Sequence, residues 1–88
     1  MREKSLQFVT SPGCHLCEEA EPVVRRAAGR FGIEVETVDI GSDDDLVRLY
    51  AWRVPVVLGP DGDVLAEGMI RERPLRSALR RMRRAGRA

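Results

Sequence analysis

The chain has 88 residues, of which 43% are hydrophobic and 33% are charged, and its formal net charge at pH 7 is +1. This length and composition suit one compact core and exclude a second one, so we expect a single domain over residues 1–88. Residues 1–4 lead into an apolar run without the hydrophobic segment of a secretory signal, and no run is long enough to cross a membrane. We therefore expect a cytoplasmic protein without a membrane partner.

The charge is distributed unevenly along the chain. Residues 1–70 carry seven Lys or Arg and thirteen Asp or Glu, whereas residues 71–88 carry eight Arg and one Glu. This pattern predicts a basic C-terminal segment on an acidic body. We interpret the segment as a solvated surface, with docking of a partner as the alternative. Because no aromatic residues are interleaved with the arginines, we expect no nucleic-acid partner.

The first two predicted elements are a strand and a helix. Residues 6–10 form a short apolar run with β-branched and aromatic members, which is typical of a buried strand. A helix over 16–31 follows, because acidic residues lie in its early turns, basic residues in its late turns, and Glu21 and Arg25 are spaced as an ion pair. Its apolar positions at helical spacing are Leu16, Ala20, Val23, Ala27 and Phe31.

A second strand and a short helix are predicted next. Gly32 ends the first helix, and apolar and acidic residues alternate over 33–40 as in a strand with one buried face. Ser42 precedes three aspartates, which predicts that its hydroxyl caps a short helix reaching Tyr50.

The last third of the chain predicts a hairpin and a final helix. Residues 54–58 and 64–67 are predicted strands joined by a turn at Pro60–Gly62. The order β-α-β-α-β-β-α, with a right-handed βαβ unit first, predicts an α/β fold with a four-stranded mixed sheet flanked by helices on both faces. The buried stripe of the final helix is predicted to hold Leu75, Ala78, Leu79 and Met82.

The two cysteines of the chain, Cys14 and Cys17, lie between the first predicted strand and the first predicted helix. Side chains at positions i and i+3 of a helix share a face, at a separation that a disulfide tolerates. Cys14, at the helix start, faces unpaired backbone N–H groups and the positive end of the helix dipole, which favour its thiolate, whereas Cys17 lies one turn deeper. We therefore predict thiol–disulfide exchange, with Cys14 as nucleophile and Cys17 as resolving thiol.

Other interpretations of the cysteine pair stay open. Cys14, Cys17 and His15 cannot complete the four-ligand set of a structural zinc site within one chain, so we expect no metal and a monomer. A dimer that pools two pairs could bind zinc or an iron–sulfur cluster, and two inert buried thiols are a further alternative. The last alternative is a non-catalytic domain that docks to a partner through the basic C-terminal helix.

Three residues near the predicted site allow two interpretations each. As an imidazolium, His15 would stabilise the Cys14 thiolate, and the alternative is an exposed polar residue. Leu16 is expected to pack rather than to contact substrate. Trp52, the only tryptophan, is expected to pack partly against the second helix, with contact to a protein partner as the alternative.

Four features together resemble a small glutaredoxin-like protein of the thioredoxin-fold superfamily. They are the run Ser11–Cys17, Pro22 inside the first helix, Val54–Pro55 before the third strand, and the order of elements. The resemblance covers nearly the whole chain. It implies a thioredoxin-like fold and a dithiol–disulfide oxidoreductase that needs no cofactor.

The resemblance also implies how a substrate is bound. Pro55 is expected to be cis and to lie against Cys14, so that the Val54 backbone can pair with an extended peptide. Pro12 and Gly13, from the turn before the dithiol, are counted among the substrate-binding residues. The expected substrate is a protein disulfide or a low-molecular-weight disulfide.

The chain departs from the glutaredoxin pattern at two places. Glutaredoxins carry a Pro-Tyr-like dipeptide between the cysteines, where this chain has His15–Leu16, and a Gly-Gly turn with acidic residues, where it has Gly68 and Arg71. The electron donor therefore stays open between glutathione and thioredoxin reductase. Arg53, directly before Val54, is a candidate for holding a glutathione carboxylate, with a solvated arginine as the alternative.

Overall fold

The computed structural model describes residues 5–87, with the side chains of residues 5–85. The expectation of no secretory signal rests on residues 1–4, which lie outside this range. The described part of the chain has no helix that combines the length and apolarity needed to span a membrane. In chain order the elements are β1 (Ser5–Thr10), α1 (His15–Arg30), β2 (Glu34–Asp39), the 3-10 helix η1 (Ile40–Ser42), α2 (Asp44–Tyr50), β3 (Val56–Leu58), β4 (Val64–Glu67) and α3 (Glu72–Arg87).

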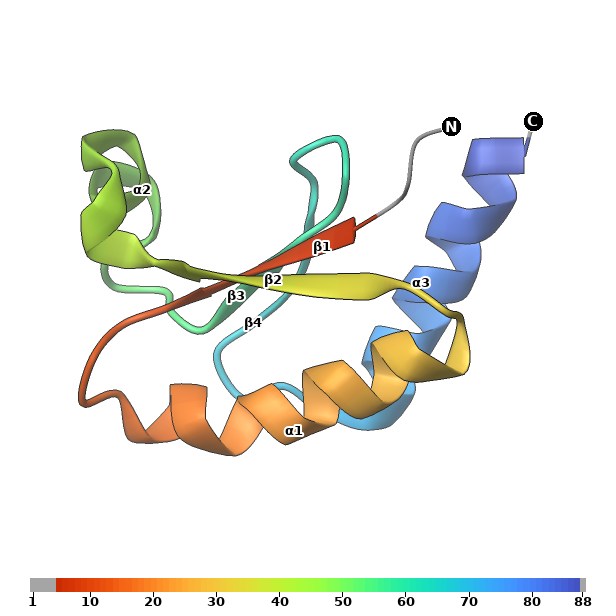
Figure 1. Ribbon diagram of the computed structural model, residues 1–88, viewed down its shortest axis with the longest axis horizontal. Coiled ribbons are helices and arrows are strands. Elements are labelled where there is room, and N and C mark those ends of the chain that lie inside the picture. Colours follow the sequence, from red (N-terminus) through yellow and green to blue (C-terminus); the bar gives the residue numbers. More distant parts are fainter. Residues whose placement is uncertain (1–4, 88) are drawn as a thin grey trace.

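The four strands form one mixed sheet in the order β2-β1-β3-β4. β1 pairs in parallel with β2, while β3 pairs antiparallel with both β1 and β4. Because a parallel pair needs a crossover, α1 connects β1 to β2, whereas a tight turn joins β3 to β4. α1 and α3 cover one face of the sheet, and η1 and α2 lie over the other (Figure 1). The predicted mixed sheet with helices on both faces is confirmed.

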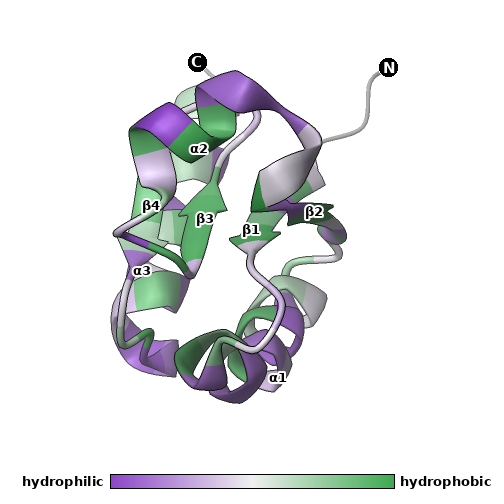
Figure 2. Ribbon diagram, turned by 90° about the vertical axis from the view of Figure 1, so that its left-hand side faces the viewer, coloured by the Kyte–Doolittle hydropathy of each residue, from purple (hydrophilic) through white to green (hydrophobic). Residues whose placement is uncertain are grey.

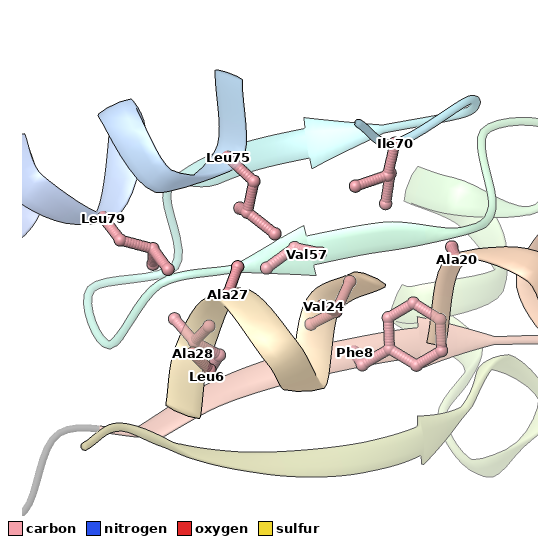
Figure 3. Close-up of a cluster of buried hydrophobic side chains, with 10 residues drawn as sticks. All are labelled: Leu6, Phe8, Ala20, Val24, Ala27, Ala28, Val57, Ile70, Leu75 and Leu79. Atoms are coloured by element: carbon pink, nitrogen blue, oxygen red, sulfur yellow. The ribbon is translucent and has the colours of Figure 1, made fainter. Parts of the chain in front are cut away.

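Alternation of side chains along β1 and β3 builds two apolar layers. Leu6 and Phe8 face α1 and α3 together with Val57 (Figure 3). Val9 and Val56, one residue out of phase with them, face α2 instead. All five side chains are at most 1% exposed. Full burial of such a side chain contributes about 1.5–3 kcal/mol, so covering both faces is what stabilises the sheet.

The buried stripe of α1 differs from the predicted one. Cys17 and Val24 are 2% and 0% exposed, whereas Val23 is half-buried and Leu16 is 40% exposed. Ala28 is also fully buried, and it lies on the same helical face as Cys17 and Val24. The helix is therefore rotated toward these residues, and the prediction that Leu16 packs in the core is wrong.

The cap of α2 lies one residue later than predicted. The Asp43 side chain, not Ser42, caps the helix by accepting a hydrogen bond from the Asp45 N–H at 2.7 Å. Ser42 instead ends η1, which starts at the buried residue Ile40. The extra 3-10 turn lengthens the connection from β2, so the residue with extended backbone geometry that a cap requires is Asp43.

The hairpin and the final helix follow the prediction closely. β3 starts at Val56 rather than Val54, because Pro55 has no N–H with which to join the ladder. The predicted stripe of α3 is confirmed: Leu75, Ala78 and Leu79 are buried, and Met82 is partly buried against the same cluster.

Candidate functional site

Three connecting segments meet at one end of the sheet. Val9, near the end of β1, pairs with Val56 at the start of β3, and Val56 pairs with Glu67 at the end of β4. The turn after β1, the segment before β3 and the segment after β4 therefore emerge side by side. Figure 2 faces this end, with α2 above the sheet and α1 below it.

The turn after β1 places Cys14 directly before the first residue of α1. Gly13 has a φ of 74°, a left-handed conformation that glycine adopts without steric cost. The Cys14 N–H then donates to the Ser11 carbonyl at 3.2 Å, and the Cys14 carbonyl accepts the first helical bond from the Glu18 N–H at 3.1 Å. Cys14 is thus the N-cap residue of α1. Pro12 and Gly13 are both exposed on this turn.

Cys14 and Cys17 form a disulfide with a Cα–Cα distance of 5.2 Å. The Cys17 N–H donates to the Cys14 sulfur at 3.1 Å, so a backbone donor of the first helical turn points at this sulfur. The burial of the two residues differs, because Cys14 is half-buried while Cys17 is 2% exposed. The two cysteines are therefore close enough to form a disulfide, as their spacing predicted, and the two sulfurs have unequal surroundings.

His15 turns toward the next helical turn. Its Nε2 lies 2.9 Å from Glu19 Oε2, and its side chain is 80% exposed. The exposed position agrees with the second interpretation given to this residue. An effect of the imidazole on the Cys14 thiolate stays a prediction.

The Val54–Pro55 peptide bond is cis, as the resemblance implied. Pro55 is buried and its carbonyl accepts a hydrogen bond from the Gly68 N–H at 2.9 Å. The Val54 N–H donates to the Tyr50 carbonyl at 3.1 Å, so this amide already has a partner within the chain. A substrate strand that pairs with Val54 in this conformation would therefore use its carbonyl.

Arg53 is held by a carboxylate of the same chain. Its Nε lies 2.6 Å from Glu67 Oε1, its Nη2 lies 3.2 Å from Glu67 Oε2, and its guanidinium lies 5.3 Å from the centre of the Tyr50 ring. The hydrogen bond to Glu67 raises the pKa of Arg53, and the same bond lowers the pKa of Glu67. Arg53 is therefore exposed, as in the second interpretation, but it is paired with a carboxylate of its own chain. The role of Glu67 was not predicted, because Arg53 lies in the turn before β3 and its partner depends on how β3 pairs with β4.

Trp52 lies outside the core. Its side chain is 99% exposed, so the predicted packing against α2 is wrong. Tyr50, two residues earlier, takes the inward position and is 9% exposed. Met69, in the segment after β4, is a further apolar residue exposed by 68%.

A separate pocket of about 520 Å³ lies at the opposite end of the sheet. The β3–β4 turn and the second half of α3 line it, with Asp61 and Arg81 among the lining residues. None of the cysteine-bearing turn lines this pocket, so it does not belong to the dithiol site. Among the described residues, no group of three or more His, Cys, Asp or Glu side chains is arranged to hold a metal ion.

The model of the glutaredoxin-like domain (DUF836) matches residues 5–80. The chain belongs to this glutaredoxin-like family. No curated protein matches it. An X-ray structure of target protein XcR50 from X. campestris is 27% identical, with a TM-score of 0.74 over 88% of this chain and 97% of that one. Protein Ne2328 from Nitrosomonas europaea is 30% identical, with a TM-score of 0.68 over 80% of this chain and 84% of that one.

Thioredoxin 1 from Thermosipho africanus has the same fold at low sequence identity. It is 14% identical, with a TM-score of 0.68 over 96% of this chain and 99% of that one. The thioredoxin-like fold expected from the resemblance is therefore confirmed for this glutaredoxin-like chain. A paired Cys14–Cys17 on this fold fits a redox function.

Proposed function

We propose that this glutaredoxin-like protein is a thiol–disulfide oxidoreductase that reduces disulfides through Cys14 and Cys17. The observation that carries the proposal is the inequality of the two sulfurs. Cys14 is half-buried at the helix cap and its sulfur accepts a backbone hydrogen bond, whereas Cys17 is 2% exposed beneath it. The surroundings of Cys14 favour its thiolate, whereas the burial of Cys17 shields that sulfur from outside reagents.

The proposed cycle starts from the reduced dithiol. The Cys14 thiolate attacks one sulfur of the substrate disulfide, a mixed disulfide forms, and the other substrate sulfur leaves as a thiolate that takes up a proton. Cys17 then loses its proton and attacks the Cys14 sulfur, which releases the second substrate thiol. Two electrons pass to the substrate, and the Cys14–Cys17 disulfide that forms has the pairing seen in the structure.

A donor must return these two electrons before the next cycle. Glutathione and thioredoxin reductase are the candidates, and the substrate is a protein or low-molecular-weight disulfide. Both cysteines belong to one chain, so the cycle needs no second copy. We assign the protein to the cytoplasm, where the reducing environment keeps a dithiol of this kind available.

Single substitutions of the two cysteines test the division of roles. Reduced protein is mixed with a neutral disulfide, and the released thiol and the protein mass are followed in a single turnover. Cys14→Ser should abolish thiol release, because the attacking sulfur is absent. Cys17→Ser should still release one substrate thiol and should then accumulate a mixed disulfide on Cys14, because no resolving sulfur follows.

The double variant Cys14→Ser/Cys17→Ser is the matched control and should release nothing. Far-UV circular dichroism of all variants confirms that the fold is kept. Equal residual activity in the two single variants would contradict the assignment of attack to Cys14, and inactivity of the reduced wild-type protein would contradict the proposed function.

A further inference from the structure

Arg53 lies at the dithiol end of the sheet, directly before the Val54–Pro55 bond. This segment emerges beside the turn that leads from β1 to Cys14, because Val9 pairs with Val56. A free guanidinium at this place would attract negatively charged molecules as they approach the dithiol. Whether the guanidinium is free therefore affects which disulfides reach Cys14.

Glu67 engages the guanidinium with both of its carboxylate oxygens. The two contacts of 2.6 and 3.2 Å use the Nε and Nη2 edge of Arg53, which is the edge that suits a planar carboxylate. The Arg53 guanidinium also lies over the Tyr50 ring, with its central carbon 5.3 Å from the ring centre. A carboxylate of an incoming molecule would have to displace Glu67 to form the same pair of hydrogen bonds.

We propose that Glu67 determines specificity at the dithiol by occupying Arg53, so that small anionic disulfides lose the cation that would bind them. The inference rests on the proposed function and names its substrate class: neutral disulfides, including those of proteins, rather than small polyanionic ones. The Arg53–Glu67 pair carries no net charge, and the start of α1 adds exposed glutamates at positions 18 and 19. The neutral pair does not attract an anionic reagent, and the two glutamates repel it.

Arg71 supplies a matched control in the neighbouring segment. It is an exposed arginine four residues after Glu67, and its Nη2 lies 3.9 Å from the Met69 sulfur. Removing it changes the net charge as much as removing Arg53 does, yet it does not touch the pair of Arg53 with Glu67. If only net charge matters, removing either arginine should slow the reaction with an anionic disulfide equally. In the proposed mechanism only the removal of Arg53 should cancel the effect of freeing it from Glu67.

The test compares two substrates of different charge. Single-turnover rate constants of the reduced protein are measured with oxidised glutathione, which is anionic, and with hydroxyethyl disulfide, which is neutral. In Glu67→Gln the ratio of the anionic to the neutral rate constant should rise about tenfold, because Arg53 becomes available for charge-assisted hydrogen bonds. The rise should shrink at high salt.

Two double variants show whether a rise in this ratio depends on Arg53 or on net charge. Glu67→Gln/Arg53→Gln should return the ratio to within about twofold of wild type. Glu67→Gln/Arg71→Gln should keep most of the rise. A ratio that stays unchanged in Glu67→Gln, or a rise that persists without Arg53, would overturn the proposal.

A binding measurement keeps the inference separate from the proposed function. The oxidised protein is titrated with S-methylglutathione, which cannot exchange thiols, while the Arg53 Nε–H resonance is followed by NMR. On addition of S-methylglutathione, this resonance should shift in Glu67→Gln and stay in place in the wild-type protein. If wild type reduces neither disulfide, the proposed function fails, but this titration still decides the inference: no shift in Glu67→Gln, or an equal shift in wild type, overturns it.

Discussion

Trp52 and Tyr50 lie two residues apart and take opposite environments. Tyr50 ends α2 and is 9% exposed, whereas Trp52 in the following turn is 99% exposed. Which of two nearby aromatic residues faces the core depends on the residue at which the helix ends, and helix ends are the least predictable part of a sequence pattern. An exposed indole offers a large rigid surface, which suits contact with a protein.

The fluorescence of Trp52 should be that of a solvated indole. It is the only tryptophan of the chain, so the signal has one source. Emission should peak where N-acetyltryptophanamide emits in water, and iodide should quench it almost as efficiently as it quenches that free compound. Reduction of the disulfide should change the spectrum little. A blue-shifted spectrum with weak quenching would show instead that the indole is packed.

The dithiol could be predicted at residue resolution, but the pair of Arg53 with Glu67 could not. The spacing of Cys14 and Cys17 and the helical pattern after them are local features, so the place of the pair at the start of α1 followed from the sequence. The contact of Arg53 with Glu67 depends on how β3 pairs with β4, and that register shifts between Val57 and Leu58. A shift of one residue exchanges the faces of a strand, so the pair needed coordinates.

At the scale of elements, Glu72 joins α1 to α3. Its Oε1 lies 3.0 Å from Arg26 Nε and its Oε2 lies 3.5 Å from Arg30 Nε. The hydrogen bond from Arg26 lowers the pKa of Glu72, with further lowering by the charges of Arg26, Arg76 and Arg30. This contact therefore links protonation of one carboxylate to the docking of two helices.

The stabilisation by Glu72 should depend on pH. Because the pKa of Glu72 is lower in the folded chain than in the unfolded chain, its contribution is present above the ordinary glutamate pKa and is lost as pH falls through the folded value. Glu72→Gln should lower the melting temperature slightly at neutral pH and leave it unchanged at acidic pH, where the Glu72 carboxylate is protonated in the folded chain. Glu36→Gln, an exposed residue on β2, is the control. An equal difference from wild type at both pH values would contradict the linkage.

The order of elements was predictable because each element carries its own period. Strands show alternation or short apolar runs, and helices show apolar residues three or four positions apart. The buried stripe of α1 was harder to predict, since Val23 and Val24 are adjacent and equally apolar. Only packing against Phe8 and the rest of the first layer decides that Val24 is the buried one.

At the scale of the whole molecule, the two ends of the sheet differ in character. One end carries the dithiol and the cis Val54–Pro55 bond, and the other carries the pocket between the β3–β4 turn and α3. Most arginines of the basic helix are exposed, as predicted, and Arg83 lies 5.5 Å from the centre of the Phe31 ring. The side chain of Arg87 lies outside the described part. Sequence periodicity could place the dithiol at the start of α1, but the pocket depends on how distant segments meet.

The central claim is that Cys14 is the attacking sulfur and Cys17 the shielded one. Its most direct test is alkylation of the fully reduced protein with limiting iodoacetamide near neutral pH, followed by mass spectrometry of the peptides. Cys14 should be modified well before Cys17, and it should still react at pH values at which both cysteines of the urea-unfolded chain have become unreactive. Equal labelling of the two cysteines, or a pH profile of Cys14 that matches the unfolded chain, would contradict it.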